Sequence, residues 1–292
     1  MPRSERSPHY LLGVVLVLLS GVALSTLGVG LRQVESATGW QILFYRSIAF
    51  TVMLLLIISI RYRGGTIRAF RSIGHRGFLV AVFLATSSLL YVFAMLNTTV
   101  ANATFIVSTT PFMAAALGWL VLREVVTLTT WIAMLVALFG VVLMVADGME
   151  SGSLTGVGLA LGVAFLTACM LVTVRGASEI DMIPALVIAG VLTTLFTAVM
   201  VHDFHISGHD LTVAIFLGAG QYAIGFVLIT VGTRYVPVAE VALLALMETV
   251  LAPIWAWWGA GEMPSNLTIV GGIIVLAAAL GRGVIGLRAS RG

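Results

Sequence analysis

The chain has 292 residues and a net charge of +3 at pH 7, with 60% hydrophobic and only 9% charged residues and a mean hydropathy of +1.12. Soluble domains carry about 25% charged residues, so this composition excludes an ordinary water-soluble globular fold. The single cysteine, Cys169, excludes an intramolecular disulfide and a cysteine-based metal site, and we expect it to be a packing residue.

The charged residues separate long apolar stretches, each of which is long enough to form a transmembrane helix. A helix crosses the bilayer with about 20 apolar residues. The stretch 77–122 has room for two helices joined by the polar turn LNTTVAN. The sequence therefore predicts an all-α multi-pass membrane protein with ten transmembrane helices. The nearly charge-free stretches are 7–31, 36–60, 77–122, 125–146, 151–174, 182–202, 211–233, 235–261 and 263–281.

The distribution of the fifteen cations, all of them arginines, predicts the orientation of these helices. With the N-terminus in the cytosol, only Arg32 faces outward and Arg46 lies within a helix, which follows the positive-inside rule. We therefore expect a bacterial inner-membrane protein with both termini in the cytosol, embedded in the lipid bilayer and without a nucleic-acid partner. The remaining arginines then lie at the cytosolic side: Arg3, Arg6, Arg61, Arg63, Arg68, Arg71, Arg76, Arg123, Arg175, Arg234, Arg282, Arg288 and Arg291.

The chain aligns with itself in two places. Residues 100–124 overlie residues 238–262 at a shift of 138, and the first apolar stretch overlies the sixth at a shift of 143. Both alignments keep the order of the helices, which indicates an internal repeat. Coinciding pairs are Val100/Val238, Ala114/Ala252, Trp119/Trp257, Glu124/Glu262, Gly13/Gly156, Leu16/Leu159 and Arg32/Arg175.

Each repeat has five helices, and an odd number requires the second repeat to enter the membrane upside down. Arg32 is then outside and its counterpart Arg175 inside. We predict one repeat over 1–148 and an inverted repeat over 149–292. Inverted repeats of this kind are typical of secondary transporters, whose substrate sites lie near the midplane between the repeats.

Several motifs resemble the drug/metabolite transporter superfamily, of the EamA type. A glutamate closes the fourth helix of each repeat, in "GAGE" at Gly261–Glu262 and in the departed form "LRE" at Arg123–Glu124. The run "VPVAEVALL" resembles the start of the family's ninth helix, and "FYRSIAF" resembles its second helix, with Arg46 at the family's arginine. The resemblance covers essentially the whole chain.

This resemblance implies a carrier of small molecules without a cofactor. In the family, helices 1–4 and 6–9 line the central cavity, and helices 5 and 10 are peripheral. Among the branches of the family, the chain is most similar to bacterial amino-acid exporters of the YddG type.

Three charged residues lie inside apolar stretches, where each is costly unless it is paired or faces water. Glu240 lies one turn inside the cytosolic boundary, and we expect an interfacial anchor that reaches the headgroups or Arg234. Glu248 lies about 16 Å beyond Pro237, near the midplane, either at a transport site or in a structural pair. Arg46 lies ~10 Å deep, either paired with Glu248 across the repeats or as a snorkelling or clamping residue.

Polar and aromatic residues recur on single faces of other helices. Such a mixture suits a pocket for a small solute with an apolar tail, and the alternative is hydrogen bonding between helices. The residues on these faces are Thr98, Asn102, Phe105, Thr109 and Phe112 in helix four, Ser87 and Tyr91 in helix three, and Gly218, Gln221, Tyr222 and Gly225 in helix eight.

Two prolines fall within the repeat-equivalent helices four and nine. Pro111 and Pro253 each remove a helical hydrogen bond, so they are candidate hinges, with static bends as the alternative. The segment "HDFHISGHD" (202–210) could hold a weak metal site, but we expect a solvated loop and no metal.

The sequence thus predicts a secondary transporter that exports small metabolites, most similar to carriers of neutral or aromatic amino acids, by alternating access. A carrier of drugs or other metabolites is the main alternative. An intramembrane enzyme would need a nucleophile–base pair or a metal cluster at membrane depth, and no histidine lies there. The candidate solute or coupling residues are Arg46, Ser87, Tyr91, Thr98, Asn102, Thr109, Gln221, Tyr222 and Glu248. The sequence leaves monomer and homodimer as alternatives.

Overall fold

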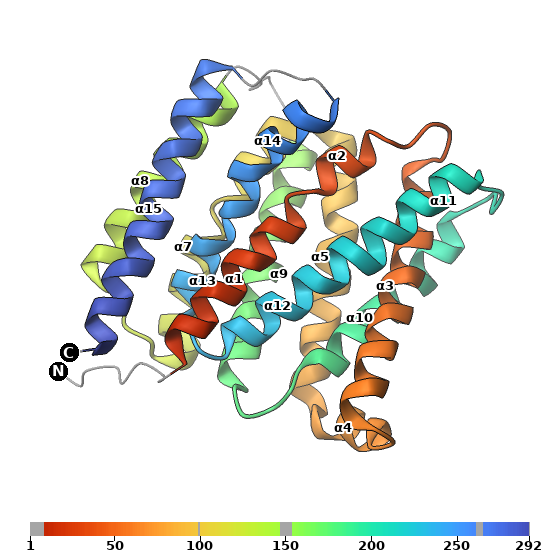
Figure 1. Ribbon diagram of the computed structural model, residues 1–292, viewed down its shortest axis with the longest axis horizontal. Helices are drawn as coiled ribbons and strands as arrows, with labels where there is room; N and C mark the ends of the chain where they lie inside the picture. Colours follow the sequence, from red (N-terminus) through yellow and green to blue (C-terminus); the bar gives the residue numbers. More distant parts are fainter. Residues whose placement is uncertain (1–8, 99, 147–153, 261–264, 292) are drawn as a thin grey trace.

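The computed structural model describes residues 9–98, 100–146, 154–260 and 265–291. Within these ranges the chain is helical, without a strand, and the helices form one bundle (Figure 1). The described residues include nine helical spans that are long and apolar enough to cross a membrane, together with the shorter apolar helix Leu128–Met144. The predicted all-α membrane fold is confirmed.

The ten crossings are numbered here as spans 1 to 10, and several spans consist of more than one helix. Span 4 ends in a π-helical turn (Gly118–Leu122), and a π-helical segment (Phe216–Tyr222, the π segment) lies within span 8. A short helix, α4 (Thr66–Ser72), connects spans 2 and 3. The spans are α1 (Tyr10–Leu24) with α2 (Leu27–Leu31), α3 (Gly39–Tyr62), α5 (Gly74–Asn97), α6 (Val100–Val107) with α7 (Thr110–Leu117), α8 (Leu128–Val145), α9 (Leu154–Gly176), α10 (Ile183–Met200), α11 (Gly208–Ile215) with α12 (Ala223–Thr233), α13 (Val238–Ala245) with α14 (Met247–Ala260), and α15 (Asn266–Arg291).

Polar residues at the span boundaries set where the helices begin and end. Thr38 and Gln41 form a reciprocal capping box at the start of α3, and Thr127 and Ser207 cap α8 and α11. These side chains satisfy N–H groups that a helix start leaves without a partner. The predicted polar turn between spans 3 and 4 is also present, because α5 ends at Asn97 and α6 begins at Val100.

The packing between spans repeats itself in the way that two inverted repeats require. Span 1 packs on span 8 through α1 and α12, as span 6 packs on span 3 through α9 and α5. Span 1 also packs on span 9, as span 6 packs on span 4, and α3 packs on α11 and the π segment as α10 packs on α5. The equivalent spans 2 and 7, 4 and 9, and 5 and 10 pack directly on each other, through α3·α10, α7·α13 and α8·α15.

The two faces of the bundle are distinguished by the ends of the chain. The start of α1 and the end of α15 lie on one face, here called the terminal face, together with α4 (Figure 1). The starts of α8 and α13 lie on the same face, since Tyr10, Thr130, Glu240 and Arg282 are hydrogen-bonded there. The opposite face carries α2 and the start of α11 (Figure 1).

Spans 4 and 9 are both interrupted, and the interruptions coincide under the repeat. The break in span 4 lies at Ser108–Thr109, and the break in span 9 lies at Leu246, the residue that overlies Ser108 at the shift of 138. Three successive hydroxyl groups donate to carbonyl oxygens of the preceding turn at this break: Ser108 to Phe105, Thr109 to Ile106 and Thr110 to Val107, at 2.5–2.6 Å. At this break, hydroxyl groups thus act as hydrogen-bond partners of the backbone, which lipid cannot do.

The two candidate hinge prolines lie at different positions relative to these breaks. Pro111 lies in the first turn of α7, immediately after the break, where its missing N–H group costs nothing. Pro253 lies inside α14, well beyond Leu246, so it does not make the break in span 9. A hinge role remains a prediction for both residues.

Substitution of a glycine between spans 5 and 10 should destabilise the bundle. A Cβ atom at Gly271 would lie 2.3 Å from the carbonyl oxygen of Gly140, whereas one at Gly281 in the same helix would meet no atom within 4 Å. We expect Gly271→Val to cost about 1–3 kcal/mol by overpacking and Gly281→Val to cost much less. Thermal unfolding of the purified protein measures both, and equal losses of stability would contradict the packing of α8 on α15.

Candidate functional site

An arginine and a tyrosine from different repeats meet in the interior of the bundle. The guanidinium carbon of Arg46 on α3 lies 4.5 Å from the ring centre of Tyr222 in the π segment. This distance is that of a cation–π contact. The two helices approach closely because Gly218 has no side chain: a Cβ atom there would lie 2.2 Å from the carbonyl oxygen of Arg46.

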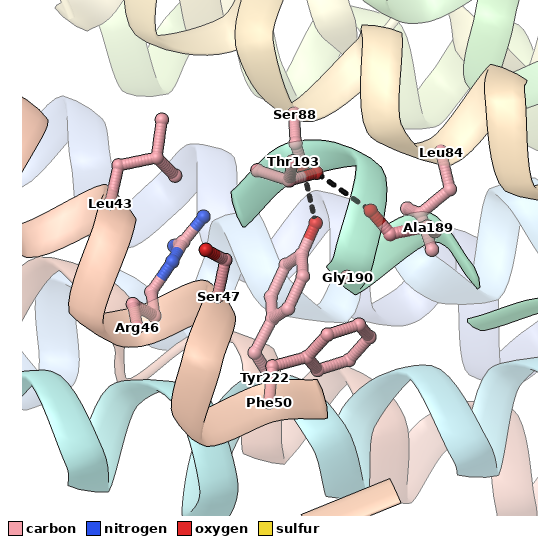
Figure 2. A pocket seen from close by; sticks show the side chains of 10 residues that line it. All are labelled: Leu43, Arg46, Ser47, Phe50, Leu84, Ser88, Ala189, Gly190, Thr193 and Tyr222. Atoms are coloured by element: carbon pink, nitrogen blue, oxygen red, sulfur yellow. Dashed lines mark hydrogen bonds between the residues drawn. The ribbon is translucent and has the colours of Figure 1, made fainter. Parts of the chain in front are cut away.

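The two side chains border a small cavity between spans 2, 3, 7 and 8. Figure 2 shows the Tyr222 hydroxyl directed towards Ser88 of α5, to which it is hydrogen-bonded. On the α10 side, the Ser47 hydroxyl lies 2.8 Å from that of Thr194, and Thr193 donates to the carbonyl of Ala189 at 2.9 Å. The cavity is lined by Leu43, Arg46, Ser47, Phe50, Leu84, Ser88, Ala189, Gly190, Thr193 and Tyr222.

Glu248 occupies the first turn of α14, directly after the break in span 9. The N-terminus of a helix carries a partial positive charge and free N–H groups, which favour a carboxylate. Span 1 lies against this turn, because a Cβ atom at Gly21 would contact Met247 at 2.9 Å and the Glu248 nitrogen at 3.4 Å. Protein atoms surround Glu248, yet its side chain is only partly buried. We infer that its accessible surface faces the interior of the bundle.

Two tyrosines lie near both Arg46 and Glu248. The phenol groups of Tyr91 on α5 and of Tyr222 are each close enough for the charges of both residues to act on them. Arg46, Tyr91, Tyr222 and Glu248 come from spans 2, 3, 8 and 9, so each repeat supplies two of them. These four candidates are the ones that the fold brings together.

The direct ion pair that we considered for Arg46 and Glu248 does not form. Among the described residues, the ion pairs join Arg61 to Asp181, Arg175 to Glu124 and Arg282 to Glu240. The guanidinium of Arg46 stacks on Tyr222 instead. Both charges therefore remain available to a third partner.

The other candidate residues lie in contacts between or within helices. Ser87 is buried and bonds to the Thr167 hydroxyl of α9 at 3.1 Å. Thr109 bonds to a carbonyl at the break in span 4, and Thr98 lies at the end of α5. Gln221 donates to the carbonyl of Leu24 at 2.9 Å, and its own buried carbonyl oxygen has no hydrogen-bond partner. The side chain of Asn102 lies outside the part of the chain that the structure describes.

Sequence reasoning missed Ser88, which bonds to Tyr222. Ser88 precedes Tyr91 by three residues, so both lie on one face of α5. That spacing was a usable signal. Ser47, Phe50 and Thr193 also line the cavity, but no pattern distinguishes them from other residues of apolar helices.

The expectation for Glu240 was wrong. The residue is buried, with only 4% of its surface exposed, and its side chain does not reach towards the headgroups. It accepts a hydrogen bond of 2.6 Å from the Tyr10 hydroxyl and forms a buried ion pair with Arg282 rather than with Arg234. The reason is that α13 lies in the middle of the bundle, where a carboxylate needs partners from neighbouring helices.

The residues of the histidine-rich loop serve as contacts between segments. In the described residues, no group of three or more His, Cys, Asp or Glu side chains could hold a metal ion. Asp210 is fully buried and accepts hydrogen bonds of 2.8–3.0 Å from the backbone of Glu35, Ser36 and Ala37. The loop before span 2 is thereby fixed to the start of span 8.

A methyl group at Gly218 should disturb the position of Arg46. We expect Gly218→Ala to push the π segment away from α3, separating Tyr222 from the guanidinium group. Gly220→Ala is the matched control, because its Cβ atom would meet only the Phe216 ring, at 3.4 Å. Transport in proteoliposomes and thermal unfolding should both be impaired in the first variant and close to normal in the second. Normal transport by Gly218→Ala would show that this contact is not needed.

Comparison with known proteins identifies the family. The model of the EamA-like transporter family matches twice, over residues 11–146 and 152–282. No curated protein sequence matches. Among 29 matching chains of solved structures, one described only as "Crystal structure of protein" has a TM-score of 0.81 at 14% identity, covering 95% of this chain and 98% of that one. That likeness concerns the fold, whereas the two matches to the family model cover most of the sequence: the chain belongs to the EamA-like transporter family.

Proposed function

We propose that the protein exports neutral or aromatic amino acids through the interior of the bundle by alternating access. The observation that carries this proposal is the pair of opposite charges, Arg46 and Glu248, which share two tyrosines but do not form an ion pair with each other. Membership of a family of transporters supports the carrier function, and the site supports the substrate class.

An amino-acid zwitterion matches this arrangement of charges. Its carboxylate can accept two parallel hydrogen bonds from a guanidinium group, and its ammonium group can bind Glu248. A bound zwitterion would compensate both of these interior charges at once, which neither a simple cation nor a simple anion can do. A polyanionic solute would leave negative charge uncompensated beside Glu248.

The apolar lining supports a neutral or aromatic side chain. Tyr222 forms ring contacts with Phe50 and Phe226 at centroid distances of 4.9 and 4.5 Å. Leu43 and Leu84 complete an apolar wall beside the arginine. Apolar walls with a few placed polar groups are the usual composition of small-molecule sites.

We also propose the orientation and the boundary that the sequence predicts. The protein would lie in the bacterial inner membrane with its termini, and hence the terminal face, in the cytosol. The repeats would extend over 1–148 and 149–292, with the boundary outside the described residues. The positive-inside rule supports this orientation, since Arg61, Arg63, Arg68 and Arg71 lie in or beside α4 on the terminal face.

Neutralising Glu248 should impair transport more than stability. In proteoliposomes tested with a panel of amino acids, with and without a pH gradient, we expect Glu248→Gln to slow transport or remove its pH dependence. Losing one charge-assisted hydrogen bond of about 1.5–3 kcal/mol weakens binding roughly tenfold to hundredfold. Glu179→Gln, which changes an exposed carboxylate, is the matched control.

The double variant with Arg46→Gln tests whether the two charges depend on each other. Because the two side chains form no direct ion pair, adding Arg46→Gln should not restore the free energy of unfolding that Glu248→Gln loses. A double variant that regains both stability and transport would assign Glu248 to a structural pair and contradict the proposed site.

The orientation can be tested with single cysteines in a Cys169→Ala background. Gln33 and Ser72 are both exposed, on opposite faces of the bundle. In intact cells, Gln33→Cys should react with an impermeant thiol reagent, and Ser72→Cys should react only after permeabilisation. The reverse pattern would place the termini outside the cell.

A further inference from the structure

The first half of span 9, α13, lies in the centre of the terminal face. Its residues from Val238 to Leu244 are all buried, although the spans around it expose apolar side chains to lipid. It packs on α1, α7, α8, α9, α12 and α15. A helix that is buried on every side fills the core of its bundle, and α13 fills it between the terminal face and the break that precedes Glu248.

Spans 4 and 9 meet on this face. On the terminal side, α7 packs on α13. On the opposite side, α6 packs on α8 and α9, and α14 packs on α1, α2 and α15. The interior is thus closed by α13 on the terminal face, and a route to that face requires α13 to move.

A buried ion pair holds α13 in place. Glu240 accepts from the Tyr10 hydroxyl at 2.6 Å and pairs with Arg282, and the Arg282 Nε atom donates to the Thr130 hydroxyl at 2.7 Å. The side chains of Glu240 and Arg282 are 5% and 2% exposed. Spans 1, 5, 9 and 10 are therefore tied together at one point, two from each repeat.

Glu124 fixes the beginning of the same helix. Its carboxylate accepts from the Val238 backbone nitrogen at 3.1 Å and from the Arg175 Nε atom at 2.8 Å. Between these two attachments lies a small cavity lined by Glu124, Thr130 and Glu240, among others. Space for rearrangement thus adjoins the helix on its terminal side.

A buried ion pair is a poor way to achieve stability alone. Removing two charges from water is costly, and apolar residues of similar volume often hold a core equally well. Here the Arg282 Nη1 atom is also buried without a hydrogen-bond partner. The strength of this ion pair depends on one defined geometry. An ion pair of this kind can hold a helix in one conformation of the protein and release it in another.

We propose that Arg282 is a positioning residue of the transport cycle. Its ion pair with Glu240, here called the lock, holds α13 across the terminal face, and this ion pair breaks when the carrier opens to that face. Span 10, which the family resemblance makes peripheral, then takes a direct part in opening the terminal face. The inference rests on the proposed alternating access but not on the identity of the solute.

The lock can be tested by the reactivity of a cysteine at Ala242, a buried residue of α13. In detergent-solubilised Cys169→Ala protein, where both faces are accessible, Ala242→Cys should react slowly with a polar maleimide. Adding Arg282→Gln should speed this reaction roughly tenfold, because the rate follows the population of the open state. Asp210→Asn, which weakens a buried carboxylate contact on the opposite face, is the matched control and should leave the rate unchanged.

Thermal unfolding separates a lock from a merely structural contact. If Arg282→Gln does not fold, the labelling rate is measured with Tyr10→Phe instead, because this variant keeps the ring and removes one hydrogen bond from Glu240. Faster labelling in a variant that stays folded supports the lock. Labelling at the parent rate in the folded variant overturns it, as does equal acceleration by Asp210→Asn. The labelling experiment needs no solute, so its result holds even if none of the amino acids in the transport assay is transported.

Discussion

A polar group in the interior of a membrane protein has to find its partner within the protein, and most of the internal organisation of this chain follows from that constraint. It applies first to the backbone. At the turn between α1 and α2, the carbonyls of Val22, Ala23 and Leu24 accept hydrogen bonds from the side chains of Ser25, Thr26 and Gln221. The break in span 4 uses hydroxyl groups in the same way, so a span can be interrupted without exposing its backbone to lipid.

The same constraint divides the charged side chains in the interior of the bundle into two kinds. Glu240 has its partners in the fold itself, through Arg282 and Tyr10, and it holds four spans together. Arg46 has an aromatic ring and Glu248 has a helix N-terminus, which stabilise each charge only in part. A charge that the fold compensates only in part is suited to bind a ligand, whereas a charge that pairs within the fold is suited to hold helices in one arrangement.

Hydrophobic length predicts the spans, their number and the inverted repeat, because the thickness of the bilayer fixes how long each apolar stretch must be. It does not predict which side of a helix faces lipid. Residues 238–245 are apolar on nearly every side, so the depth of Glu240 could be read from the sequence but its central position could not. Its partner Arg282 lies 42 residues away, and recognising it requires knowing that span 10 packs beside α13. For Ser88, in contrast, the spacing to Tyr91 already contained the information.

The two repeats share their packing but differ in where they are interrupted, and this difference has a physical meaning. Span 1 turns at Ser25 and Thr26, while the equivalent span 6 is one continuous helix, α9. The turn in span 1 is held by Gln221 of span 8 and, through Ser25, by Trp255 of span 9 at 2.8 Å. Both contacts tie the opposite side of the bundle to the spans that carry Tyr222 and Glu248. If the repeats were identical, the two access states of the proposed transport cycle would be symmetric and equally stable. Because the repeats differ, the contacts near the two faces also differ: an ion pair holds α13 near the terminal face, and hydrogen bonds hold an interrupted helix on the opposite side.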